Sequence, residues 1–359
     1  MTKILELTQK LISIPSWVDE QTNEVKIGKF IFEYLKNNSR LSLEKEIVVD
    51  GRFNILARNN QDIETLVMGH IDTVGIDNNW ETDPVNPIIM DGKLFGRGTT
   101  DMKSGLAAMM LIATDKNLPK NIGFLFYVDE EYNFAGIKKF ISDYGKKLKP
   151  KSIISLDGSE LEIANGCRGL IEISATVKGI SCHAATPENG INAIEVTTKS
   201  IEKLKEFLSQ SVDPELGTIS VNLAFIEGCG SSSNVVPDNC QFTLDIRPSS
   251  SKISAQLIIN QLKKYITELR GELSSYKVKF DFGSWLTPKS KLTKLGLDFK
   301  NISTSGYIDI QMLWQIFNQP KCLTIGAGTQ QTAHSSNEYV EIKKLEKLPN
   351  ILLDIIQKI

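Results

Sequence analysis

Histidine is scarce in this chain of 359 residues, and each of its three copies, His70, His183 and His334, lies in a distinctive sequence context. His70 follows the apolar run 66–68, which we expect to form a buried strand, and Asp72 comes two residues later. At the end of a strand, residues i and i+2 point to the same side. One ring nitrogen of His70 could therefore bind a metal ion while Asp72 orients the other nitrogen or a neighbouring group.

Acidic residues stand at the ends of other predicted elements. Asp101 opens a predicted helix after a glycine-rich segment, Glu130 and Glu131 follow a predicted strand, Asp157 follows another, and His334 lies in a late loop. Zinc binds imidazole nitrogen and carboxylate oxygen, but these acids are too many for one ion and would repel one another. Two divalent ions about 3.5–4 Å apart, with one shared aspartate, would resolve the excess of negative charge.

Each of these residues also has an ordinary structural interpretation. A lone histidine near a strand end usually fills a structural role. Asp101 could be the N-cap of a helix, a position that aspartate favours. Glu130 and Glu131 could be solvated acids in the first turn of a helix, where the helix dipole favours them. Asp157 could be a turn residue before Gly158.

The composition excludes several classes of function. The net charge is −2, so the chain lacks the basic footprint of a nucleic-acid-binding protein. No run approaches the roughly 18–20 apolar residues of a membrane-spanning helix. The five cysteines form no CxxC pair, and the first 14 residues have the pattern of an amphipathic helix rather than of a signal peptide. We therefore expect reduced thiols and a cytoplasmic protein.

Strands and helices alternate in the first part of the chain, which predicts an α/β sheet with its site at the carboxyl ends of the strands. The expected strands are 43–49, 53–58, 64–69, 122–128 and 152–156, and the expected helices include 2–14, 22–37 and one ending near 114. From about residue 168 the pattern changes to a compact α+β unit, with two helices on one face of an antiparallel sheet. The α/β pattern returns after Trp285. The predicted domains are therefore 1–167 with 283–359, and an inserted domain at 168–282.

Four segments, in this order, carry a family resemblance. They are Gly69-His70-Ile71-Asp72-Thr73-Val74, Gly96-Arg97-Gly98-Thr99-Thr100-Asp101-Met102-Lys103, Asp129-Glu130-Glu131 and Ala333-His334-Ser335-Ser336-Asn337-Glu338. Together they resemble the M20 family of dizinc metallopeptidases and deacylases. The resemblance implies a mixed-sheet, zinc-peptidase-like catalytic domain and an inserted ferredoxin-like domain that acts as a lid and in dimerisation.

The resemblance also implies a role for each candidate residue. His70 and Asp157 would bind one Zn²⁺, Glu131 and His334 the other, and Asp101, followed by a cis peptide bond, would bridge both. Asp72 would orient His70, and Glu130 would be the general base. Asp157 departs from the pattern, since many deacylases have Glu-Pro-Thr where this chain has Asp-Gly-Ser.

In the inserted domain, the segment Cys182-His183-Ala184-Ala185-Thr186-Pro187 resembles the family's lid motif. His183 would donate a hydrogen bond to the developing oxyanion, in the active site of a partner subunit, unless it merely caps a loop. Arg247, helped by Asn234, would bind a substrate carboxylate, although Arg247 could instead form an ordinary ion pair with Asp245.

The predicted function is that of a zinc-dependent amidohydrolase, with Co²⁺ or Mn²⁺ as possible native metals. The expected substrate is a small N-acyl amino acid, of the acetylornithine or succinyl-diaminopimelate kind, and the expected assembly is a homodimer through the lid. A dipeptidase or carboxypeptidase is the alternative within the family. A catalytically inactive binding protein on the same fold is the alternative of another class. The Gly-x-Ser-x-Gly elbow of many serine hydrolases does not occur.

Overall fold

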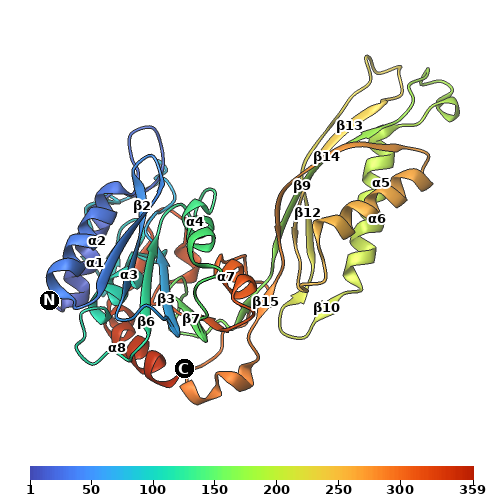
Figure 1. Ribbon diagram of the computed structural model, residues 1–359. Helices are drawn as coiled ribbons and strands as arrows, with labels where there is room; N and C mark the ends of the chain where they lie inside the picture. Colours follow the sequence, from blue (N-terminus) through green and yellow to red (C-terminus); the bar gives the residue numbers. More distant parts are fainter. The chain divides into compact units, whose positions relative to one another are not determined.

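The computed structural model describes residues 1–359, which form two compact units (Figure 1). The first unit comprises Met1–Asn165, Thr287–Lys300 and Met312–Ile359, and the second comprises Gly166–Leu286 and Asn301–Gln311. The sequence-based boundaries placed 301–311 with the first unit, whereas this segment packs in the second. There the ring of Tyr307 stacks on Phe282 with centroids 5.0 Å apart, and the Arg168 backbone N–H donates to Ser305 Oγ.

A mixed six-stranded sheet forms the centre of the first unit, in the order β1-β2-β6-β3-β7-β16. β1 and β2 are antiparallel to their neighbours, whereas β6, β3, β7 and β16 run parallel. The strands are β1 (Ser42–Val49), β2 (Arg52–Arg58), β3 (Thr65–His70), β6 (Ile122–Tyr127), β7 (Ser152–Ser155) and β16 (Lys321–Thr324). All residues of β6 and β7 are buried, which explains why these strands read as continuous rather than alternating apolar runs.

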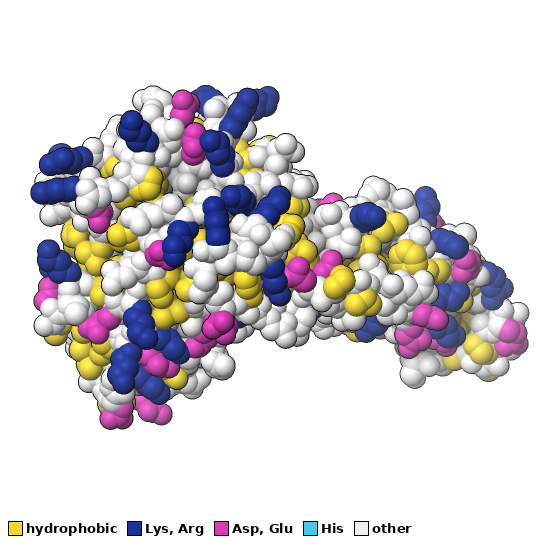
Figure 2. All heavy atoms as spheres, turned by 90° about the horizontal axis from the view of Figure 1, so that it is seen from below, with side chains coloured by type: hydrophobic (Ala, Val, Ile, Leu, Met, Phe, Trp, Pro, Cys, Tyr) yellow, Lys and Arg dark blue, Asp and Glu magenta, His cyan; other side chains and the backbone are white.

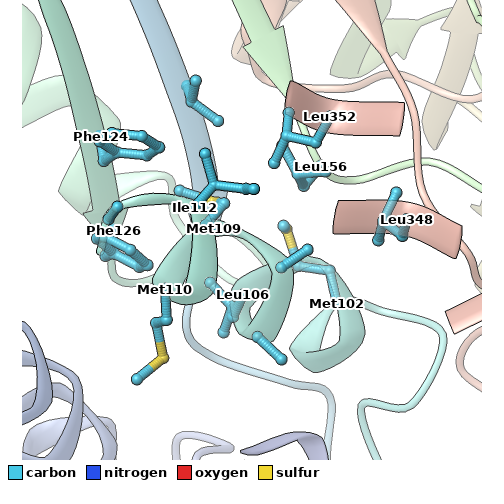
Figure 3. Close-up of a cluster of buried hydrophobic side chains, with 14 of the residues drawn as sticks. Met102, Leu106, Met109, Met110, Ile112, Phe124, Phe126, Leu156, Leu348 and Leu352 are labelled. Atoms are coloured by element: carbon cyan, nitrogen blue, oxygen red, sulfur yellow. The ribbon is translucent and has the colours of Figure 1, made fainter. Parts of the chain in front are cut away.

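Helices cover both faces of this sheet, with α4 on the face opposite α1 and α2 (Figure 1). The helices of the unit are α1 (Lys3–Ile12), α2 (Val25–Asn38), α3 (Lys103–Ile112), α4 (Ala135–Tyr144), α7 (Ile310–Ile316) and α8 (Ile342–Lys358). The first two residues of the short α7 belong to the second unit. Helix α3 is buried on nearly all sides, because α1 and α8 both pack against it. Figure 3 shows Leu106 and Met109 of α3 between Phe124 of β6 and Leu348 of α8. This cluster fixes the helix that begins just after Asp101.

The second unit has the strand and helix order β9-α5-β12-β13-α6-β14 and an antiparallel sheet in the order β12-β13-β9-β14. Its elements are β9 (Leu170–Lys178), α5 (Ala193–Ser209), β12 (Ser220–Gly228), β13 (Asn239–Arg247), α6 (Ala255–Glu268) and β14 (Glu272–Phe282). Both helices lie on one face (Figure 1), and the alternating burial of β13 directs Cys240, Phe242, Leu244 and Ile246 toward them. This is the ferredoxin-like arrangement. The predicted α/β fold with an inserted α+β unit is confirmed.

Short elements complete the two units. They are β4 (Ile88–Met90), β5 (Lys93–Phe95), β8 (Gly166–Cys167), β10 (Val212–Asp213), β11 (Gly217–Thr218), β15 (Trp285–Leu286) and β17 (Tyr339–Glu341). Strand β17 pairs with β5, which brings the segment after His334 beside the segment before Asp101. All five cysteines are free. None of the helices combines the length and the apolar character that a membrane span requires. On the face shown in Figure 2, basic and acidic side chains are interspersed.

Candidate metal centre

Three neighbouring parallel strands end at one edge of the six-stranded sheet and carry most of the candidate residues. His70, the last residue of β3, pairs with Tyr127, the last residue of β6. On its other side, Met68 pairs with Ser155, the last residue of β7, and Asp157 follows two residues beyond the end of that strand. The carboxyl ends of these strands therefore bring segments far apart in sequence to one place.

Three predicted ligands, His70, Glu131 and His334, come together around a fourth, Asp101. One ring or carboxylate atom each of His70, Asp101 and Glu131 lies within 4.8 Å of the other two. His70 Nε2 is 2.9 Å from Asp101 Oδ1, whereas His334 Nε2 is 3.1 Å from Asp101 Oδ2 and 3.0 Å from Glu131 Oε1. Each oxygen of Asp101 thus faces a different histidine, which is the arrangement expected of a carboxylate shared by two ions.

Asp72 holds two parts of this cluster in place. His70 Nδ1 lies 3.1 Å from the Asp72 carbonyl oxygen and 3.5 Å from Oδ1. The Asp72 carboxylate also accepts the backbone N–H groups of Glu130 (3.1 Å) and Glu131 (2.9 Å). The sequence predicted that Asp72 orients His70 or a neighbouring group. The structure adds that Asp72 sets the backbone position of the two glutamates.

Glu130 and Glu131 lie in a turn and not, as expected, at the end of an extended strand. β6 ends at Tyr127 and α4 begins at Ala135, so the two glutamates precede the first turn of the helix. The interpretation of these residues as acids of a first helical turn is therefore wrong. The Tyr132 hydroxyl, which donates to the Thr73 carbonyl oxygen and accepts the Val18 N–H, fixes the next residue of the turn.

The loop that presents Asp101 is organised by a residue to which the sequence assigned no role, Glu338. Its buried carboxylate accepts backbone N–H groups from Gly98, Thr100 and Asp101, and it pairs with Arg97 at 2.9 Å. Gly98 has φ +86°, a conformation that favours glycine. The peptide bond between Asp101 and Met102 is cis, as expected. Met102, not Asp101, is the N-cap of α3, so the capping interpretation of Asp101 is wrong.

Burial and the hydrogen bonds between imidazole and carboxylate act against each other in this cluster. Burial favours neutral His70, but hydrogen bonds to Asp101 and Asp72 outweigh burial and hold the His70 pKa well above its ordinary value. Hydrogen bonds to Asp101 and Glu131 raise the pKa of His334 to about 10. Burial opposes ionisation of Asp101, yet hydrogen bonds from the two histidines lower its pKa. A bound cation would have to displace these imidazole protons, so cation affinity should rise with pH.

The donor set suits a pair of divalent transition-metal ions. Two imidazole nitrogens and the carboxylates of Asp101 and Glu131 converge, and such mixed nitrogen and oxygen ligands are typical of zinc and related metals. Asp72 lies behind the His70 ring, and the backbone N–H groups of Asp101 and Glu131 donate to Glu338 and Asp72, the kind of support that metal ligands usually have. The residues therefore fit a metal centre.

The remaining predicted residues lie on other elements. Asp157 follows β7, and its backbone N–H donates to Ser155 Oγ at 3.3 Å. In the second unit, His183 is exposed, and its Nδ1 accepts the Ala185 N–H. Its backbone forms a bridge with Val235, so the exposed Asn234 lies in the neighbouring loop. Arg247 makes a two-point ion pair with Asp245, at 2.7 and 2.9 Å, as its ordinary interpretation anticipated.

A family model for peptidase family M20/M25/M40 matches residues 66–358, and the chain belongs to this family. It is therefore a hydrolase of the metallopeptidase and amidohydrolase class. It is 27% identical over 377 residues to the acetylornithine deacetylase of Buchnera aphidicola subsp. Schizaphis graminum, covering 98% of this chain and 97% of the relative. It is also 27% identical to a succinyl-diaminopimelate desuccinylase of Buchnera aphidicola subsp. Acyrthosiphon pisum, over 99% and 98% of the two chains.

Solved structures share the fold over the whole chain. The aminopeptidase PepT of Bacillus cereus superposes with a TM-score of 0.78 at 20% identity, covering 99% of this chain and 98% of that one. The YXEP protein of Bacillus subtilis, described as a dinuclear metal binding peptidase from the M20 family, has a TM-score of 0.70 at 14% identity and covers 99% and 98%. Both similarities concern the fold of the chain.

Proposed function

We propose that this chain is a dizinc amidohydrolase that removes the acyl group from a small N-acyl amino acid. The observation that carries the proposal is that His70 and His334 face the two oxygens of Asp101, with Glu131 beside His334. Two full-length relatives named as deacylases, of acetylornithine and of succinyl-diaminopimelate, support the substrate class. Asp157 is the proposed fifth ligand, since it follows the carboxyl end of β7, the parallel neighbour of the strand that ends in His70.

Glu130 is the proposed general base. Its backbone N–H donates to Asp72, as does that of the proposed ligand Glu131, so Asp72 fixes the backbone of Glu130 next to the cluster. Glu130 would take a proton from the attacking water and later deliver it to the departing nitrogen. The bound ions would polarise the amide carbonyl and acidify the water. Positioned proton transfer of this kind contributes about 10²–10⁴-fold to a rate.

The second unit is proposed to act as a lid and dimerisation domain, with His183 donating to the oxyanion. Recognition of a substrate carboxylate is proposed for Arg247, with Asn234. The pairing of Arg247 with Asp245 does not exclude this role, because Arg168 adds a second positive charge nearby. Burial, and then the positive charge of Arg247, lower the pKa of Arg168. Two guanidinium groups with one paired acid leave an excess of positive charge for an anionic substrate.

The test is a hydrolysis screen with the metal-loaded protein. N-acetylornithine, N-succinyl-diaminopimelate, a dipeptide and a tripeptide would be compared by their kcat/KM values, with Glu130→Gln as the matched variant. We expect an N-acyl amino acid to be hydrolysed best and Glu130→Gln to lower kcat by about 10²–10⁴-fold while still binding metal. Preference for a peptide would favour a dipeptidase or carboxypeptidase instead. Absence of hydrolysis of every linear amide would refute the proposal.

A further inference from the structure

Strand β2 carries two buried polar residues, Arg52 and Asn54, in an otherwise apolar stretch that continues through Phe53 and Ile55. Residues two apart on a strand point to the same side. β2 is antiparallel to β6, whose end leads into the turn of Glu130 and Glu131. Buried polar groups are costly unless they are hydrogen-bonded, so the partners of these two side chains indicate what they are for.

Arg52 reaches the start of the glutamate turn. Its Nε and Nη2 donate to the two oxygens of Glu24 at 2.6 and 2.5 Å, and Nη2 also donates to Asp129 Oδ1 at 2.6 Å. The Asp129 N–H donates back to Glu24 Oε1, and Asp129 Oδ2 accepts the Ala135 N–H beyond the turn. Asp129 has φ +69°, an uncommon conformation for a residue with a side chain. Arg52 thus holds the residue directly before Glu130 in a specific backbone conformation.

Asn54 joins the two ends of the same segment. Its Oδ1 accepts the Val128 N–H at 3.2 Å, and its Nδ2 donates to the Gly136 carbonyl oxygen at 2.8 Å. Gly136 can come this close only because it lacks a side chain. A Cβ there would lie 2.2 Å from the Val128 carbonyl oxygen and 2.7 Å from Asn54 Oδ1. One strand therefore fixes both ends of 128–136, while Asp72 holds its middle.

We infer that Arg52 and Asn54, together called the β2 clamp, are positioning residues that fix Glu130 and Glu131 for the proposed reaction. The inference rests on the proposed function for the roles of these two glutamates. The clamp touches neither substrate nor metal, and it acts through Asp129, Val128 and Gly136. A fold-stabilising salt bridge alone would not require three separate contacts with one turn.

The test compares Arg52→Lys with Arg58→Lys. Lysine keeps the charge of Arg52 but cannot reproduce the planar group that binds Glu24 and Asp129 at once. Arg58, at the other end of β2, pairs with Glu44 and provides the matched control. Amide hydrogen exchange of peptide 128–136 would be measured in the metal-free proteins, and Co²⁺ affinity by visible absorption with the metal alone.

In Arg52→Lys we expect exchange of 128–136 to accelerate about 10–100-fold, with peptides of β3 and α8 unchanged. Co²⁺ affinity should fall about 10–100-fold, and kcat should fall with little change in KM. Arg58→Lys should leave all of these within twofold. If Arg52→Lys fails to fold, Gly136→Ala tests the same segment through its close approach to Asn54, with the same expected changes.

The inference is overturned if exchange of 128–136 and Co²⁺ affinity in the folded variant both stay within twofold of the parent. It is equally overturned if exchange accelerates throughout the first unit while Co²⁺ affinity is retained, since that pattern marks a merely structural role. Exchange is read without metal and without substrate. A parent protein that hydrolyses nothing would therefore count against the proposed function and not against the clamp.

Discussion

Replacement of Asp72 by asparagine isolates the group that connects His70 with the two glutamates. Asp72 is buried, and its carboxylate accepts two backbone N–H groups from Glu130 and Glu131. Asparagine keeps the size of the side chain, but its NH2 group would face one of the two backbone N–H groups, and neither can accept a hydrogen bond from the other. One charge-assisted hydrogen bond, worth about 1.5–3 kcal/mol, is lost, and a buried N–H is left without an acceptor.

We expect Asp72→Asn to lower the free energy of unfolding of the metal-free protein by about 2–4 kcal/mol. The turn carrying Glu131 should also shift, weakening metal affinity about 10–100-fold, as is usual when a group behind a ligand is lost. Urea titration would measure the first effect, and competition with a chromophoric chelator the second. Asp115→Asn, which alters a carboxylate accepting the Asn117 N–H after α3, is the control and should change neither quantity appreciably. Metal affinity within twofold of the parent in Asp72→Asn would refute the positioning role of Asp72.

Two further predictions concern the packing of the first unit. Burial, opposed by a hydrogen bond from Asn54, raises the pKa of Glu46 from 4.5 to about 7. Because this acid is harder to ionise when folded, its protonated form stabilises the fold fully below about pH 4.5, and that stabilisation is lost as the pH rises to about 7. Glu46→Gln should therefore have the same free energy of unfolding as the parent near pH 5, but a higher one at pH 8, by up to roughly 3 kcal/mol as measured in urea. Equal stability of the two proteins at pH 8 would contradict the raised pKa. Leu106→Ala removes a fully buried side chain from α3. It should lower the free energy of unfolding by about 2–5 kcal/mol and leave metal affinity within a few-fold of the parent. A loss below about 1 kcal/mol would show that the surrounding core collapses to fill the cavity.

Much of the fold could be predicted because its signals are local. The apolar runs of β3, β6 and β7 end abruptly in His70, Asp129 and Asp157, so the chain itself marks the edge at which polar side chains gather. Parallel pairing then brings these residues together whatever their separation in sequence. The change to an alternating pattern near residue 170 likewise marks the antiparallel sheet of the second unit.

The supporting groups could not be predicted in the same way. Arg52 lies 28 residues from Glu24 and 77 from Asp129, and Glu338 lies 237 residues from Asp101. No periodicity links such partners, because each contact depends on the packed tertiary structure. The one available signal was indirect: Arg52 and Asn54 are polar residues inside an apolar strand pattern, which indicates buried partners without identifying them.

The number of Zn²⁺ ions retained per chain tests the proposed centre most directly. The protein would be stripped with chelator, reloaded, freed of unbound metal and measured by mass spectrometry of its metal content, beside Asp101→Ala. Since Asp101 presents one oxygen to each histidine, we predict two ions per chain in the parent and fewer than one in the variant. A parent that retains fewer than two ions, or a variant that still retains two, would contradict a dinuclear centre built on Asp101.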